Sequence, residues 1–306
     1  MGAKVRKNLH ISKKNSTFAR LMKKNVYLYR VLSWLKHRLT ARNTGGHGVH
    51  SPYLFEWVRM VMSDKNAYYA WQAIEDLRSE LLHDTREVEF VDFGSGGKNG
   101  EKAKKRQGYK TKKQVCDIAK GSLAKKKYAQ LLARLVGWLR ENGERDGERG
   151  GLTVVELGTS LGITTAYMAA MDSRNRIVSY EGCPAVAEIA MANWEKLGLE
   201  NVECRVGELT IDSLQGAVDS LQKIDVAFID ANHTYEATLT YFNALASRVH
   251  DKSVIVLDDI HYNEEMERAW KAICADERVT STIDLYQMGM VFFDPHYWHR
   301  NYKMNI

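Results

Sequence analysis

The alternation of apolar and amphipathic segments between residues 151 and 275 constrains the fold more than any other feature of the sequence. The apolar segments are short, and each amphipathic stretch between them is long enough for a crossover helix. Strands are expected at residues 152–157, 176–181, 202–206, 224–230 and 253–259. This pattern predicts an α/β fold, in which a parallel sheet carries helices on both faces.

The pattern changes after residue 275. Two further apolar segments, residues 279–286 and 288–294, follow each other with no room for a helix between them. Such neighbours must pair antiparallel. We therefore expect a Rossmann-like sheet of five parallel strands closed by an antiparallel β-hairpin, an unusual ending for a dinucleotide-binding fold.

Helical spacing dominates the chain before the sheet. Ser51 and Pro52 have the residue types of a helix N-cap and first turn, and apolar side chains then recur at helical intervals. The polar, glycine-rich segment 141–150 marks a boundary. We divide the chain into a basic, partly disordered N-terminal arm (1–42), a mainly helical cap with a basic loop (43–150), a sheet domain (151–294) and a C-terminal tail (295–306).

Composition places the chain among globular proteins, and its charge is unevenly distributed. No apolar run reaches the roughly 20 residues of a membrane span, and the 4 cysteines lack metal or redox spacing, which favours a reducing, cytoplasmic setting. Residues 1–42 carry 12 Lys and Arg with no acidic residue, and residues 98–127 carry 12 with only 2 acidic residues. Two basic segments therefore accompany an acidic body.

Ligands of an open α/β sheet bind beyond the carboxyl ends of its strands, so the strand ends are where function is expected. The first strand ends in a turn with Glu156, Gly158 and Gly162, and Thr164 follows in the next helix. The second strand ends at Glu181, whose carboxylate could accept both hydroxyls of a ribose. Alternatively, the glycine turn serves only the packing of strand and helix, and Glu181 is a solvated residue at a strand end. The turn lacks the G-x-G-x-x-G spacing typical of pyrophosphate binding.

Three carboxylates follow the last two parallel strands. Asp230 ends one strand, and Asp258 and Asp259 end the next. Grouped acids favour a divalent cation such as Mg²⁺, because hard oxygen ligands suit it. Alternatively, Asp230 contacts a ligand ammonium and Asp258 caps a helix. His233 is either a catalytic base near this group or a structural histidine.

Residues 151–294 resemble the class I S-adenosylmethionine (SAM) dependent methyltransferases of the catechol and caffeoyl-CoA O-methyltransferase type. The resemblance rests on the E-L-G turn, the E-x-x-P sequence that begins at Glu181, the aspartates at the strand ends and the hairpin ending. The stretch GHGVHSP at residues 46–52 is similar to the opening of a bacterial subgroup of this family. The family membership implies a SAM-binding methyltransferase domain over residues 151–294.

The resemblance also implies roles for individual residues. Glu181 would bind the ribose of SAM, and Asp230 would be both a cofactor-binding and a catalytic residue. His233 stands where the family has a catalytic lysine, and Asp259 stands where it has asparagine. The methionine end of SAM would be held by Glu156, Gly158, Ser160, Gly162 and Thr164, and Mg²⁺ would be bound by Asp230, Asp258 and Asp259.

These observations lead to one principal functional hypothesis and two alternatives. The first is an O-methyltransferase that acts on a small hydroxylated acceptor, with Mg²⁺ and His233 assisting. The second keeps SAM but takes RNA as the acceptor, bound by the basic segments. The third is a non-catalytic module that binds SAM or another adenosine ligand.

Overall fold

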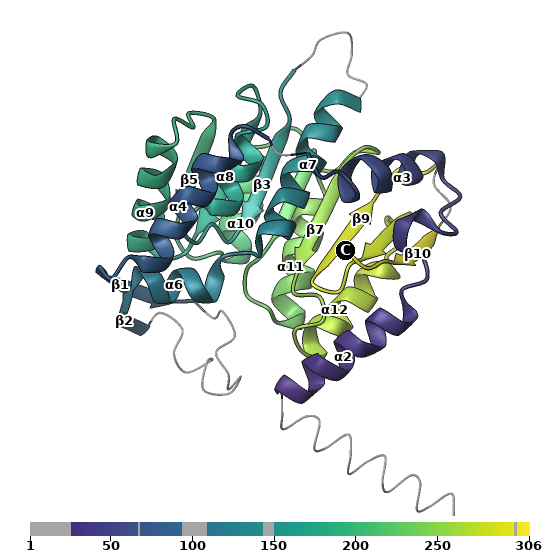
Figure 1. Cartoon of the computed structure of the whole chain (residues 1–306), viewed down its shortest axis with the longest axis horizontal. Coiled ribbons are helices and arrows are strands. Elements are labelled where there is room, and N and C mark those ends of the chain that lie inside the picture. The colour runs from purple at the N-terminus through teal and green to yellow at the C-terminus, as the bar shows by residue number, and fades with distance from the viewer. Residues whose placement is uncertain (1–25, 67, 94–108, 143–149, 297–298) are drawn as a thin grey trace, which may run out of the picture.

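An eight-stranded sheet organises the chain in this computed structural model (Figure 1). The structure describes residues 26–66, 68–93, 109–142, 150–296 and 299–306. The strand order is β10-β8-β9-β7-β6-β3-β4-β5. The strands are β3 (Thr153–Leu157), β4 (Arg176–Glu181), β5 (Val202–Val206), β6 (Val226–Ile229), β7 (Val254–Asp258), β8 (Ser281–Asp284), β9 (Met288–Phe292) and β10 (Arg300–Lys303).

The pairing confirms the predicted sheet. Strands β5, β4, β3, β6 and β7 are parallel neighbours, β9 is antiparallel to β7, and β8 is antiparallel to β9. The chain leaves β3 toward β4 on one side and returns to β6 on the other. The carboxyl end of β3 is therefore the topological switch point, where ligands of such sheets bind.

Strand β10 is an addition to the predicted sheet. Residues 295–306 were expected to form a tail, but Arg300–Lys303 pairs parallel with β8 at the sheet edge. Tyr302 and Met304 are buried in the core there. The segment RNYK is short and mostly polar, so its sequence carries no strand periodicity that would reveal it.

Helices cover both faces of the sheet. On one face, α7 and α3 pack against β7 and β9 (Figure 1), and on the other face α10, α11 and α12 build a second core. The helices are α2 (Val26–Thr40), α3 (Pro52–Trp57), α4 (Trp71–His83), α6 (Val115–Ser122), α7 (Lys126–Asn142), α8 (Ile163–Ala169), α9 (Pro184–Lys196), α10 (Ile211–Asp219), α11 (Tyr235–Ala246) and α12 (Glu264–Cys274), with a 3₁₀ turn η1 (Thr44–Gly46) and a π-helical segment η2 (Val58–Met62). Among the described residues, no helix combines the length and the apolar character needed to cross a membrane.

The cap contains a small sheet that the sequence indicates only in part. Strand β1 (Glu87–Asp92) pairs antiparallel with β2 (Tyr109–Gln114). Strand β2 is lysine-rich and follows the basic loop expected in the cap. Residues 94–108 of that loop, residues 143–149 of the boundary segment and residues 1–25 of the basic arm lie outside the described residues.

The predicted start of the first cap helix is confirmed. Helix α3 has Pro52 in its first turn, and the Ser51 hydroxyl accepts a hydrogen bond of 3.3 Å from the backbone N–H of Leu54. Such a cap satisfies a donor that the helix itself leaves unpaired. This N-cap hydrogen bond thereby fixes where helix α3 begins, and α3 packs on β9.

Candidate active site

The turn after β3 is held against its neighbours at a point that only glycine can occupy. Gly158 has a φ of +102°, and a Cβ there would lie 2.1 Å from the backbone oxygen of Asp230. Its N–H donates to the Tyr180 carbonyl across 3.0 Å, and the Asp230 N–H donates to the Leu157 carbonyl across 2.8 Å. The ends of β3, β4 and β6 are thereby brought into backbone contact.

Glycine is also required where α8 begins. Gly162 has a φ of +77°, and a Cβ at this position would lie 2.5 Å from Nε1 of Trp194. Trp194 instead donates a hydrogen bond of 2.8 Å to the Gly162 carbonyl. The predicted turn of the candidate cofactor site thus has both of its glycines at positions where their backbone conformation is needed.

Glu156 lies beneath this turn and is fully buried. Its Oε2 accepts hydrogen bonds from the hydroxyl groups of Thr165 and Ser179, while its Oε1 has no hydrogen-bond partner among the described residues. Burial raises the pKa of Glu156 to about 8, and the two hydroxyl groups oppose that rise. At neutral pH the protonated acid therefore predominates. Thr164, the predicted site residue, is also buried, but its neighbour Thr165 makes the contact.

Glu181 closes the turn from the end of β4. Its carboxylate accepts the backbone N–H of Ser160 at 2.8 Å and that of Cys183 at 2.9 Å. Burial raises its pKa, although these N–H donors favour the ionised form. A carboxylate offers about four acceptor positions, so positions for further donors remain. Ser160, the predicted site residue, has a left-handed φ of 49°.

The helical cap contacts this turn through Ser122, which is not one of the predicted site residues. The Ser122 and Ser160 hydroxyl groups lie 2.6 Å apart. Ser122 is the last residue of α6, so the helical cap contacts the turn of the sheet domain directly. Nothing in the local sequence distinguishes Ser122 from other helical serines.

His233 lies between two of the three predicted aspartates. Its Nε2 is 3.4 Å from Oδ1 of Asp230 and 4.0 Å from Oδ2 of Asp259. Burial lowers the pKa of His233, but the two carboxylates outweigh that effect and raise it. Asn232 and Asp259 have left-handed φ values of 44° and 52°. Non-glycine residues in this conformation are uncommon and gather at functional sites.

Asp258 is the most deeply enclosed of the three aspartates. Its side chain is buried, and its Oδ1 has no hydrogen-bond partner in the part of the chain that the structure describes. Burial raises its pKa well above the ordinary value, and the nearby Asp230 and Asp259 carboxylates raise it further. The three predicted aspartates thus interact electrostatically, and two of them lie close to His233.

A different set of side chains has the close spacing of metal ligands. Among the described residues, His37, His261 and Asp284 form the one set of three such side chains whose ligand atoms all lie within 4.8 Å of one another. The aspartates at 230, 258 and 259 do not meet this spacing. The Lys303 ammonium lies 3.6 Å from Asp284, so this histidine and aspartate set already has a cation beside it.

Two tyrosines complete the surroundings of the acidic cluster. Tyr128, from α7, is buried with its hydroxyl 3.5 Å from the Leu285 carbonyl. Burial raises its pKa, and Asp258 and Asp259 raise it further. The ring of Tyr262 lies 5.8 Å from the ring of His233. Tyr128 is one helical turn before Leu132 on the apolar face of α7, so the helical spacing of apolar side chains could have revealed it.

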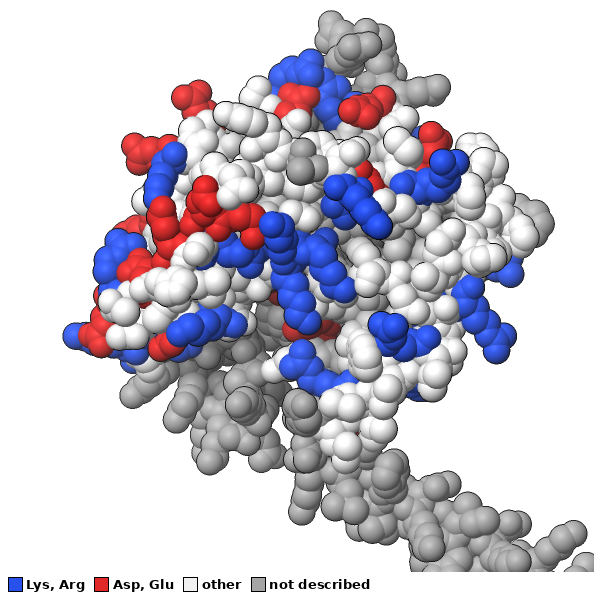
Figure 2. Space-filling view, in the orientation of Figure 1, with Lys and Arg blue, Asp and Glu red and all other residues white. Residues whose placement is uncertain are grey.

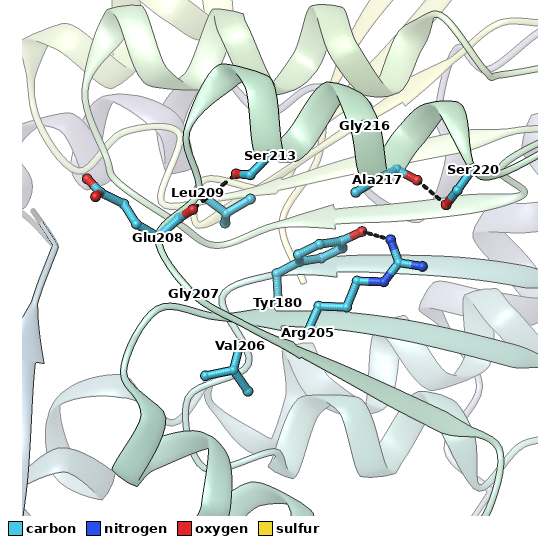
Figure 3. A pocket seen from close by; sticks show the side chains of 10 residues that line it. All are labelled: Tyr180, Arg205, Val206, Gly207, Glu208, Leu209, Ser213, Gly216, Ala217 and Ser220. Atoms are coloured by element: carbon cyan, nitrogen blue, oxygen red, sulfur yellow. Dashed lines mark hydrogen bonds between the residues drawn. The ribbon is translucent and has the colours of Figure 1, made fainter.

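A pocket of about 400 Å³ opens beside the ends of β4 and β5, below α10 (Figure 3). The Arg205 guanidinium donates a hydrogen bond of 2.9 Å to the Tyr180 hydroxyl inside it. The N–H of Gly207, at its mouth, donates to the Glu181 carbonyl across 2.9 Å. The pocket lining is Tyr180, Arg205, Val206, Gly207, Glu208, Leu209, Ser213, Gly216, Ala217 and Ser220. None of these residues was predicted as part of the site.

The family comparison identifies the segment that contains these strand ends. Residues 155–260 match a family model described as a methyltransferase domain. The match begins in β3 and ends just after Asp259, so it contains every predicted site residue. No curated protein matches the chain.

Solved structures with a similar fold include several methyltransferases. An O-methyltransferase from Bacillus cereus in complex with SAH is 17% identical, with 78% of this chain and 97% of that chain covered and a TM-score of 0.49. A putative O-methyltransferase from Klebsiella pneumoniae is 18% identical, with 56% and 82% covered and a TM-score of 0.46. The O-methyltransferase TomG from Streptomyces achromogenes, in complex with SAM, has the same identity, coverage and TM-score.

Proposed function

We propose that this chain, which carries a methyltransferase domain over residues 155–260, transfers the methyl group of SAM to a hydroxyl group of a small-molecule acceptor. One observation carries the proposal. The turn held by Glu156 and Glu181 lies in backbone contact with Asp230, whose side chain is paired with His233. A candidate cofactor site and a candidate base therefore meet at the switch point of one sheet.

In the proposed pose, SAM lies across the carboxyl ends of β3 and β4. The remaining acceptor positions of Glu181 bind the ribose hydroxyls, and the turn from Gly158 to Gly162 faces the methionine end. We place the adenine ring toward Gly207 and Leu209, because the N–H of Gly207 already bonds to the Glu181 backbone. The pocket there has a size typical of small-molecule sites.

The reaction requires the acceptor hydroxyl to lose its proton while its oxygen attacks the methyl carbon. A new O–C bond forms, the S–C bond breaks, and the electron pair of the S–C bond returns to the sulfur. In its neutral form His233 can take the proton, and the Asp230 carboxylate then stabilises the imidazolium that results. Holding acceptor and cofactor in line supplies much of the rate enhancement.

We also propose that Mg²⁺ assists. Three observations fit a cation: the donors are hard oxygens, Asp258 Oδ1 is buried without a hydrogen-bond partner among the described residues, and neighbouring carboxylates raise the pKa of Asp230 and of Asp258. Asp230, Asp258 and Asp259 would hold it once their oxygens move closer together than they lie here, and the bound ion would lower the pKa of an acceptor hydroxyl. Activity that survives excess chelator would leave His233 to act without a metal.

The test is a methyl-transfer assay with labelled SAM and a panel of small hydroxylated compounds. We expect at least one compound to be methylated on oxygen. The His233→Ala variant should form much less of this methylated product than wild type. Methylation of nitrogen or carbon only, or no product from any compound while SAM binds tightly, would contradict it. No contact among the described residues favours the RNA or the non-catalytic alternative.

A further inference from the structure

Helix α2 presents an apolar stripe to solvent. Five large apolar side chains are exposed along this one helix, and four of them recur at intervals of three and four residues that place them on one face. The exposed fractions are 38% for Leu28, 37% for Val31, 44% for Trp34, 43% for Leu35 and 84% for Leu39. A contiguous apolar surface of this kind marks a site of contact with a partner or a membrane.

The opposite face of α2 is fixed to the body of the protein. The ring of His37 is 3% exposed, and its Nε2 lies 3.0 Å from the Met304 carbonyl. The Tyr286 hydroxyl donates to the Arg30 carbonyl across 2.6 Å, and the Tyr29 hydroxyl donates to Glu267. These contacts determine which face of α2 is turned outward, so the stripe cannot rotate inward without breaking them.

Positive charge accompanies the stripe. Helix α2 contains no acidic residue, and neither does any other part of residues 1–42, which carry 12 Lys and Arg. Lys and Arg side chains lie among uncharged residues over α2 (Figure 2). The guanidinium of Arg38 lies 5.3 Å from the centre of the Trp34 ring. A partner must complement both the apolar stripe and the cations.

We propose that α2, with its basic residues Arg30, Lys36 and Arg38, binds the surface of an anionic lipid bilayer. An interfacial helix buries its apolar face at the boundary between headgroups and acyl chains, while its Lys and Arg side chains contact anionic headgroups. Trp34 suits this boundary because its ring is apolar and its N–H is polar. At 15 residues, α2 lies on the bilayer and does not cross it.

Charge distinguishes the bilayer from the other occupants. A second copy of this chain could cover the stripe, but the basic helix α2 of one copy would then face α2 of the other. The two positively charged helices would repel each other. A nucleic acid would neutralise the cations but leave Leu35 and Leu39 exposed to water. An anionic bilayer satisfies both requirements.

The experiment is co-sedimentation of the full chain with vesicles of phosphatidylcholine alone or with one third phosphatidylglycerol. We expect binding to the anionic vesicles only, and the binding should weaken as salt screens the charges. Leu35→Glu should weaken it by at least about tenfold, because it places a carboxylate in the stripe. The matched control is Met191→Glu, which changes a side chain of similar exposure (41%) on α9 and should bind like wild type.

Three results would overturn the proposal. The first is an absence of binding to anionic vesicles, or equal binding to both vesicle types. The second is a stable dimer of the wild type, without lipid, that Leu35→Glu converts to monomer, which would assign the stripe to a second copy. The third is equal loss of vesicle binding in Leu35→Glu and Met191→Glu. Unchanged melting temperatures show that both variants are folded.

Discussion

The Ser122 and Ser160 hydroxyl groups share a hydrogen bond of 2.6 Å that joins the helical cap to the turn after β3. Glu181 accepts the backbone N–H of the same Ser160. The conformation of the candidate cofactor turn thus depends on the cap as well as on the sheet. This coupling gives a direct test of whether the cap helps to organise the cofactor site.

Ser122→Ala should weaken SAM binding by a few fold, because a hydrogen bond of this kind contributes about 1 kcal/mol. Isothermal titration of the full chain measures the change. Ser79→Ala is the control, since Ser79 is an exposed helical serine of α4. Equal affinities of Ser122→Ala and wild type would show that the cap does not order the turn.

Gly158→Ala should destabilise the fold severely and abolish SAM binding. Its Cβ would meet the Asp230 backbone oxygen at 2.1 Å, and its φ of +102° is unfavourable for alanine. The control is Gly121→Ala in α6, where a Cβ has nothing within 4 Å. Thermal unfolding should show little change or a small gain for the control. A Gly158→Ala protein with wild-type melting temperature would contradict this account of the turn.

Glu156 should make stability fall as pH rises. Its pKa is raised from 4.5 to about 8, so its contribution to folding is complete below about pH 4.5 and is lost progressively up to pH 8. Glu156→Gln cannot ionise and lacks this loss. The melting temperature of the variant, measured relative to wild type, should therefore increase between pH 5 and pH 8. Parallel curves would mean that Glu156 ionises normally.

His233→Ala should reduce methyl transfer by roughly 100- to 10,000-fold, the range typical of a lost general base. SAM affinity should stay near the wild-type value, because the proposed contacts of the cofactor lie at the ends of β3, β4 and β5. His83→Ala, at an exposed position of α4, is the control. A variant that loses SAM binding and activity together would place His233 in the cofactor site instead.

Sequence reasoning succeeded where periodicity and chain connectivity dictate structure. The five parallel strands and the closing hairpin were predicted because apolar runs of that length, with or without room for a helix between them, have few ways to pair. For the same reason the candidate site residues fall at the ends of neighbouring strands. Their roles as ligands or catalysts stay predictions.

The remaining features depend on tertiary contacts that no local pattern encodes. Strand β10 is polar and forms because the exposed edge of β8 is available to it. Strand β2, which pairs with β1, is lysine-rich, and its sequence does not indicate a strand. The spacing around His233 depends on the left-handed backbone at Asn232 and Asp259, which the residue types permit but do not require.

Isothermal titration of SAM into the full chain and into Glu181→Ala tests the central claim most directly. Wild type should bind one equivalent, and the variant should bind roughly 10- to 100-fold more weakly, because the ribose loses its carboxylate partner. Glu188→Ala, an exposed acid on α9, should bind like wild type. No SAM binding by the wild type, or equal affinity in wild type and Glu181→Ala, would contradict the proposed cofactor site.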